Sequence, residues 1–276
     1  MPELPEVEHG RRVAESVAHG RTVVQAHVAS DRIVFPDGPD AVKRALKGHT
    51  VRAVKRWGKL LWLEFDRGPC VSFHFGMTGA FRTKDRAPLP LAHGPGREEP
   101  DAWPPKFCKI ELVFDGDGRL AFTNARRLGR VRLHEDIEMA LSGMGFDPLL
   151  ALPPPAKFRE LLSARSGVLK AVLLDQSFAA GVGNWTADEV LYQARIDPRR
   201  RACDLDPDEQ KRLHQALRRV IKTAVRADAH AERFPRTWLF HRRWRRSSAK
   251  AAPSKEALRF DTIGGRTTVW CPDRQH

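Results

Sequence analysis

The first residues of the chain combine a potential secondary amine with two carboxyl groups. The sequence begins Met1-Pro2-Glu3 and reaches Glu6 within one helical turn. Removal of Met1, which is usual before proline, would leave Pro2 with an α-amino group that titrates roughly 2–3 pH units below a lysine side chain. Such an amine could attack an aldehyde-like carbon and form an iminium ion, with Glu3 and Glu6 transferring protons. The same residues also suit an ordinary helix start, where proline and glutamate are common.

The chain carries a large excess of positive charge. It has 276 residues, with 48 Lys and Arg against 34 Asp and Glu, so the formal net charge is +14. Basic residues gain affinity for nucleic acids by displacing the counterions that condense on phosphates. Between Arg233 and Lys250 the basic residues alternate with Trp238, Phe240 and Trp244, and no acidic residue intervenes. This stretch favours phosphate contact, although a solvated basic loop over core aromatics would give the same pattern.

The composition also limits the class of protein. No apolar run approaches the roughly 18–20 residues that a membrane-spanning helix needs, and the first residues lack the basic stretch of a secretory signal. The four cysteines are far apart and form no CxxC pair, so neither a disulfide framework nor a four-cysteine zinc site is expected. We therefore expect an intracellular protein without membrane association.

Hydrophobic periodicity predicts an opening helix followed by a β-rich region. Apolar residues at helical spacing cover about residues 3–18. From residue 22 the period changes to two, and Asp115-Gly116-Asp117-Gly118 is typical of a hairpin turn. Many short strands favour a sandwich or a barrel, and the Pro- and Gly-rich stretch 85–105 is expected to be a surface loop. The expected strands are 22–28, 50–54, 60–65, 71–75, 110–114 and 119–122.

The pattern becomes helical beyond Pro153-Pro154-Pro155. Asp206 is a suitable N-cap for a long helix over about 207–227, whose apolar residues share one face. The chain returns to short strands near its end, at Gly264-Gly265-Arg266-Thr267-Thr268-Val269-Trp270. This order of strands, helices and a small hairpin indicates the α+β class.

The N-terminal residues carry a more specific signal. Met1-Pro2-Glu3-Leu4-Pro5-Glu6-Val7-Glu8 resembles the N-terminal signature of the formamidopyrimidine-DNA glycosylase and endonuclease VIII family, and the similarity covers nearly the whole chain. In that family the mature N-terminal proline attacks C1′ of a damaged nucleotide, displaces the base and forms a Schiff base that undergoes β- and often δ-elimination. The resemblance implies that Pro2 is the nucleophile, Glu3 the acid/base residue, Glu6 a supporting carboxylate and Lys59 a phosphate ligand at the lesion.

Two further segments resemble the loops that fill the space left by an extruded nucleotide. Phe75-Gly76-Met77-Thr78-Gly79 is similar to the loop with the family's inserting methionine, and Asn124-Ala125-Arg126-Arg127-Leu128-Gly129 to the loop whose arginine faces the orphaned base. The resemblance assigns these roles to Met77, Arg126 and Leu128. Leu128 stands where phenylalanine is usual, and leucine stacks poorly on a base. The preference for the opposite base is therefore left open.

A glycine-rich helix start follows in the second half. Gly181-Val182-Gly183-Asn184 could bring backbone N–H groups close to a phosphate, although a tight structural turn is the commoner reason for such glycines. The surrounding sequence resembles the family's helix–two-turns–helix DNA-binding motif. By position, Lys170 and Asn184 correspond to phosphate ligands, whereas Asp188 and Glu189 are expected to be structural.

The end of the chain departs from a common pattern of the family. Many members have a zinc finger with two CxxC pairs, but here only Cys271 stands at a ligand position and Arg274 replaces its partner. One thiolate cannot form a closed zinc site, so we expect neither zinc nor any other cofactor. The segment resembles the zincless finger of plant and fungal members and of one animal branch. In it, Arg266 matches the arginine that grips phosphates beside the flipped nucleotide, and the expected packing residues are Trp238, Phe240, Phe260 and Trp270.

The resemblance implies an α+β fold with an N-terminal β-sandwich flanked by helices. The second part would be a helical domain with the helix–two-turns–helix motif and a β-hairpin zincless finger. The expected boundaries are 2–134 for the catalytic sandwich domain, 135–152 for a linker, 153–231 for the DNA-binding domain and 232–276 for the finger.

The expected function is that of a bifunctional DNA glycosylase and AP lyase of base-excision repair. It would remove formamidopyrimidines and oxidised guanine products and nick the strand. The expected partner is damaged double-stranded DNA, bound by a monomer in the nucleus of a eukaryote or in the cytoplasm or nucleoid of a bacterium. The alternative is a non-catalytic protein of the same fold that binds damaged DNA.

Overall fold

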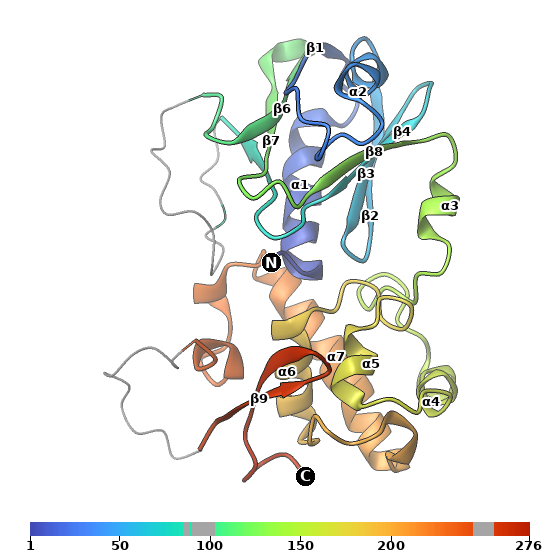
Figure 1. Cartoon of the computed structure of the whole chain (residues 1–276), viewed down its shortest axis with the longest axis vertical. Coiled ribbons are helices and arrows are strands. Elements are labelled where there is room, and N and C mark those ends of the chain that lie inside the picture. Colours follow the sequence, from blue (N-terminus) through green and yellow to red (C-terminus); the bar gives the residue numbers. More distant parts are fainter. Residues whose placement is uncertain (85–88, 90–102, 245–256) are drawn as a thin grey trace. The chain divides into compact units, whose positions relative to one another are not determined.

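The computed structural model describes residues 1–84, 89, 103–244 and 257–276. The chain divides into two compact units, Met1–Ser142 and Gly143–His276 (Figure 1). Among the described residues, no helix combines the length and the apolar character needed to cross a membrane. Most of the expected surface loop at 85–105, and Arg245, Arg246 and Lys250 of the basic stretch, lie outside the described part. The division into three domains and a linker stays a prediction.

The first unit is a β-sandwich, which confirms the predicted fold (Figure 1). Within the described residues each sheet has four strands, and all neighbouring strands are antiparallel. In order across the first sheet, the strands are β1 (Val23–Val28), β6 (Cys108–Phe114), β7 (Arg119–Thr123) and β5 (Ala80–Thr83). In order across the second sheet, they are β2 (Val51–Trp57), β3 (Leu60–Phe65), β4 (Cys70–His74) and β8 (Arg130–His134).

Aromatic rings from both sheets meet in the core of the sandwich. Phe73 of β4 lies with its ring centroid 4.9 Å from that of Phe81 on β5 and 5.5 Å from that of Phe122 on β7. Both pairs are edge-to-face, a favourable arrangement for aromatic rings. All three side chains are buried. The alternating pattern that predicted the strands thus directs its apolar face to the space between the sheets.

Helix α1 (Leu4–Ala18) packs against strands of both sheets, and Figure 1 shows it running along the sandwich. Its Gly10 allows a close approach to the sheet, because a Cβ atom there would lie 2.7 Å from the ring of Phe75. Helix α2 (Pro39–Leu46) covers β1 and β8, and the short helix α3 (Ile137–Leu141) ends the unit. A 3-10 turn over Asp115–Asp117 joins β6 to β7, where the hairpin is expected.

The second unit is helical and carries one hairpin. Helix α7 begins with a capping box, in which Asp206 accepts a hydrogen bond from the backbone N–H of Glu209 and the Glu209 carboxylate accepts one from that of Asp206. The longest elements are α4 (Pro155–Ser163), α5 (Leu169–Leu174), α6 (Asn184–Ala194) and α7 (Pro207–Arg226), and the hairpin strands are β9 (Arg259–Ile263) and β10 (Arg266–Trp270). Short 3-10 turns lie at Ala202–Asp204, Ala231–Arg233 and Leu239–His241.

The hairpin is held by packing on α6. Tyr192, Leu239, Val269 and Cys271 form a buried cluster, and Phe260 packs against it. Trp238 and Phe240 belong instead to an aromatic group around Phe234, whose ring centroid lies 5.0 Å from each of theirs. Trp270 is buried and donates from Nε1 to Asp261 of the opposite strand at 2.7 Å.

Candidate active site

The start of α1 holds the proposed nucleophile beside two carboxyl groups. Glu3 is the N-cap, and its backbone N–H donates to Oε2 of Glu6 at 3.0 Å while its own carboxylate accepts from the backbone N–H of Glu6. This reciprocal capping box fixes the side chains of Glu3 and Glu6, which follow Pro2 by one and four residues. Pro2 and Glu3 are buried. Burial and the nearby charge of Glu3 raise the pKa of Glu6 to about 7, a value suited to proton transfer at neutral pH.

A buried ion pair connects α1 to the turn that carries Lys59. Arg56 is buried and donates from Nε to Oε2 of Glu8 at 3.0 Å and from Nη1 to the carbonyl of Gly58 at 3.0 Å. Burial opposes ionisation of Glu8, but hydrogen bonds and charges of Arg11 and Arg56 outweigh it and lower the pKa of that carboxyl group. The hairpin turn between β2 and β3 is therefore fixed to α1 by side chains.

The pairing of β3 with β4 brings a further basic residue next to this turn. Leu60 pairs with His74, which places the imidazole near Lys59. Burial, together with the positive charges of Lys59 and Arg130, lowers the pKa of His74. Its Nδ1 accepts a hydrogen bond from the backbone N–H of Gly76 at 3.3 Å. His74 was not among the predicted site residues, because one histidine in a strand has no distinguishing local signal.

The two loops expected to fill an emptied base position are joined to each other. Asn124 is fully buried; its Nδ2 donates to the carbonyl of Phe75 at 3.1 Å, and its Oδ1 accepts from the backbone N–H of Gly129 at 3.2 Å. The backbone N–H of Arg126 donates to the hydroxyl of Thr78 at 3.3 Å. Together these bonds fix the loop that contains Met77 against the loop that contains Arg126 and Leu128.

Close backbone contact explains two of the glycines in these loops. Gly76 has φ 61°, and a Cβ atom there would overlap the backbone of Leu128. A Cβ atom on Gly129 would overlap the amide of Asn124 and lie 2.9 Å from the carbonyl oxygen of His74. Only glycine fits both positions without a shift of the backbone.

Asp31 holds the second loop from the other side. Arg127 donates from Nε and Nη2 to the two carboxylate oxygens of Asp31, at 2.9 and 3.1 Å, and Lys109 contacts the same carboxylate at 2.9 Å. The hydrogen bond from Arg127 is the main reason why the pKa of Asp31 lies well below its usual range. Arg126 and Leu128 flank this anchored arginine and remain exposed.

In the second unit, Asn184 and Arg266 come together through the hairpin. Asn184 begins α6, and its Nδ2 donates to the carbonyl of Thr267 at 2.9 Å. Gly264 and Gly265 have φ values of 60° and 72°, as a tight two-residue hairpin turn requires. Arg266 follows directly and is exposed. The helix start and the arginine are thus parts of one fixed structure.

The prediction that Lys170 is a phosphate ligand does not agree with this structure, because the side chain is not exposed. Its side chain is fully buried, forms an ion pair with Asp188 and donates to the backbone carbonyl of Asn184 at 3.0 Å. The other carboxylate oxygen of Asp188 accepts from the backbone N–H of Val269 at 3.2 Å. Lys170 therefore links α5, α6 and β10. A buried lysine needs such a partner, because an unpaired internal charge is strongly unfavourable.

The family models that match the chain account for most of its length. The model described as the formamidopyrimidine-DNA glycosylase N-terminal domain matches residues 1–131, and the formamidopyrimidine-DNA glycosylase H2TH domain matches residues 144–235. The chain belongs to the formamidopyrimidine-DNA glycosylase family. This confirms the resemblance found in the sequence.

Individual members of the formamidopyrimidine-DNA glycosylase family align along the whole chain. The Arabidopsis thaliana enzyme is 37% identical over 278 residues, covering 100% of this chain and 71% of its own, and that of Pelobacter propionicus is 33% identical over 279 residues, covering 99% and 98%. The solved Lactococcus lactis enzyme, bound non-covalently to DNA with an AP site, has a TM-score of 0.76 at 24% identity over 99% of both chains. The two-domain fold is therefore that of the family.

Cys271 and Arg274, which stand at the positions compared with zinc ligands, make packing contacts in this family member. Cys271 is buried in the cluster that holds the hairpin. The guanidinium group of Arg274 lies over the ring of Tyr192, with its Cζ 4.5 Å from the ring centroid. Packing and a cation–π contact thus support the hairpin at these positions.

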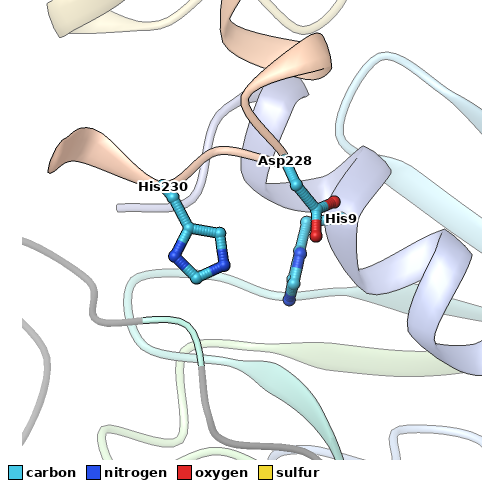
Figure 2. Close-up of side chains that lie close together, drawn as sticks. All are labelled: His9, Asp228 and His230. Atoms are coloured by element: carbon cyan, nitrogen blue, oxygen red, sulfur yellow. The ribbon is translucent and has the colours of Figure 1, made fainter. Parts of the chain in front are cut away.

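Figure 2 labels His9, which belongs to the first unit, and Asp228 and His230, which belong to the second. His9 is buried on α1. Asp228 and His230 lie in the turn after α7, where Asp228 and Ala229 have φ values of 53° and 57°. Nδ1 of His230 lies 2.9 Å from a carboxylate oxygen of Glu232. In the second unit this hydrogen bond and the two left-handed residues lie in the turn that follows α7.

Proposed function

We propose that this member of the formamidopyrimidine-DNA glycosylase family is bifunctional: it removes an oxidised base from duplex DNA and then cleaves the strand as an AP lyase. Family membership supports the glycosylase activity and a role in DNA repair. The observation that supports the lyase step is the group at the start of α1, where Pro2 precedes Glu3 and Glu6 in their reciprocal capping box. The pKa of Glu6, about 7, suits proton transfer near neutrality.

The chemistry begins once Met1 has been removed. The lone pair of the Pro2 nitrogen forms a bond to C1′, and the base departs with the electrons of the glycosidic bond and receives a proton, for which Glu3 is the proposed donor. Transfer of the amine proton of Pro2 to the ring oxygen O4′ then breaks the bond between C1′ and O4′, opens the sugar ring and gives an iminium ion between the Pro2 nitrogen and C1′. Loss of a proton from C2′ sends its electron pair towards the iminium, and the 3′-phosphate leaves. The iminium is the electron sink, so elimination needs no other electron acceptor.

The remaining predicted residues are proposed to hold the DNA. Lys59 and Arg266 would contact phosphates near the lesion, and Asn184 would present the first turn of α6, where N–H groups favour an anion. Met77, Arg126 and Leu128 would occupy the space left by the extruded nucleotide, and the bonds of Asn124 keep their loops in a fixed relation. We propose that the protein acts on damaged duplex DNA as a monomer.

Strand cleavage on a duplex with one abasic site tests this proposal. The chain without Met1 is compared with the same chain carrying a short peptide ahead of Pro2, and the control carries that peptide after His276. We expect cleavage by the first and third proteins and none by the second, because only in the second is the Pro2 nitrogen part of an amide and unable to act as a nucleophile. Equal cleavage by all three would contradict the role of Pro2. Tight binding without cleavage by any of them would favour a non-catalytic binder of damaged DNA.

A further inference from the structure

The second unit contains an open cavity that the proposed chemistry does not use. It has a volume of about 750 Å³ and is formed by the second half of α6, the middle of α7, the segment 235–242 and Arg274. This volume lies within the range of small-molecule sites. Tyr192, in its wall, follows Asn184 by eight residues, or about 12 Å along the helix. The cavity is therefore separate from the phosphate contacts proposed for the start of α6.

The lining of the cavity is strongly basic. Among the residues that the structure describes, four arginines line it, and Glu189 is the one carboxylate in the lining. Both oxygens of Glu189 are engaged with the scaffold: Oε1 accepts from Gln193 at 2.8 Å and Oε2 from the backbone N–H of Phe240 at 2.9 Å. Burial raises the pKa of Glu189 to about 7, so this group is only partly ionised at neutral pH. Within the lining, one partly ionised carboxyl group thus accompanies four guanidinium groups. The four arginines are Arg219, Arg236, Arg242 and Arg274.

Three of these guanidinium groups are held in place by neighbouring side chains. Arg242 donates to the hydroxyl of Tyr192 at 2.7 Å and lies over the ring of that residue, as does Arg274. Arg219 donates from Nε to Gln193 at 2.9 Å, which leaves its Nη groups without a carboxylate partner in the described part of the chain. Fixed guanidinium groups lose little conformational entropy when a ligand binds.

We propose that this cavity is a binding site for neighbouring phosphate groups, carried either by a free di- or triphosphate or by adjacent nucleotides of a DNA strand. The planar guanidinium group matches two oxygens of a phosphate, and four such groups around one cavity suit a ligand with several negative charges. The volume exceeds that of one phosphate group, so adjacent phosphates fit the cavity better. This site is independent of the proposed lyase chemistry.

Calorimetric titration of the full chain with inorganic pyrophosphate tests the site. The cavity variant carries Arg219→Gln and Arg236→Gln, and the control carries Arg218→Gln and Arg226→Gln, which remove the same charge from exposed positions outside the cavity. We expect the cavity variant to bind about ten-fold or more weakly, because two charge-assisted contacts are lost, and the control to bind like the parent protein. Equal weakening in both variants, or no saturable binding by the parent protein, would overturn the proposal.

A second titration identifies the source of the phosphates. The protein is first saturated with a short duplex that contains an abasic-site analogue. Retained pyrophosphate binding that depends on Arg219 and Arg236 indicates a free phosphate ligand. Lost pyrophosphate binding, with weaker binding of a longer duplex by the cavity variant only, indicates a DNA strand. A preference for poly-glutamate over pyrophosphate would contradict the phosphate site and indicate an acidic protein partner. Thermal unfolding of each variant checks that the fold is intact.

Discussion

Glu6 illustrates how one turn of helix sets the properties of a single residue. Its carboxyl group caps the backbone N–H of Glu3 and lies beside a second carboxyl group, and these surroundings raise its pKa to about 7. A raised pKa means that the folded protein binds a proton that the unfolded chain releases near pH 4.5. The protonated form therefore stabilises the fold at low pH. This contribution decreases as the pH rises through about 7.

Replacement of Glu6 by Gln should remove this dependence. Between about pH 5 and about pH 8 we expect the free energy of unfolding of the parent protein to fall, relative to Glu6→Gln, by on the order of 2 kcal/mol. This free-energy difference is smaller than the pKa shift of Glu6 alone would give, because solvent reaches part of the Glu6 side chain. Urea unfolding of both proteins at several pH values measures the difference. Parallel stability profiles would show that Glu6 titrates normally.

Leu128 offers a second test at the scale of one residue. It is 46% exposed at the tip of its loop, where an aromatic side chain could stack on a base. We expect Leu128→Phe to bind a duplex with an abasic-site analogue about 2- to 12-fold more tightly, as a stacking contact of about 0.5–1.5 kcal/mol implies. Leu150→Phe, at another exposed position, is the control. Equal affinities for all three proteins would exclude Leu128 from the contact with the bases.

At the scale of elements, the structure depends on side chains that join distant segments. Asn124 and Phe75 are 49 residues apart, Arg56 and Glu8 are 48 apart, and Arg127 and Asp31 are 96 apart. These pairs hold the loops and the turn on which the predicted site residues lie. No local pattern indicates such pairs, and for this reason the sequence analysis did not identify Asn124, Arg56 or Asp31.

The bond network of Asn124 can be tested directly. Asn124→Ala leaves a buried carbonyl of Phe75 and a buried N–H of Gly129 without this partner, which should cost about 1–3 kcal/mol of unfolding free energy. We also expect slower base removal, because Met77 and Leu128 lose their fixed relation. Val71→Ala, in the core of the sandwich, is a control for stability alone. If it slows base removal equally at a matched loss of stability, Asn124 has no positioning role.

The secondary structure was largely predictable where local signals were strong. The helix after Asp206 has a cap, a proline at its first position and one apolar face, and α7 spans Pro207–Arg226. Strand β8 was missed because its alternation covers only five residues, of which Val131 and Leu133 alone are apolar. Helix α2 was missed because its eight residues are too few for a clear period. The site residues were predicted from family resemblance rather than from periodicity. The burial of Lys170 then showed that its side chain is not available to a phosphate in this structure.

At the scale of the whole molecule, the net charge of +14 should govern affinity for DNA. Each phosphate neutralised by a basic residue releases counterions, so affinity falls with salt concentration. We expect Arg266→Gln to reduce the slope of log K against log salt concentration by about 1, because one phosphate contact is lost. Arg159→Gln removes the same charge from an exposed position on α4 and should leave the slope unchanged. Identical slopes for both variants would remove Arg266 from the contacts with phosphate.

Borohydride trapping on a duplex with one abasic site is the most direct test of the proposed chemistry. Borohydride reduces an iminium ion to a stable amine, so the protein remains covalently attached to the DNA, and mass spectrometry then locates the attachment. We predict a covalent complex whose adduct lies on the nitrogen of Pro2. An adduct on a lysine would keep the lyase activity but assign it to another nucleophile. The absence of any adduct, with binding intact, would contradict the account.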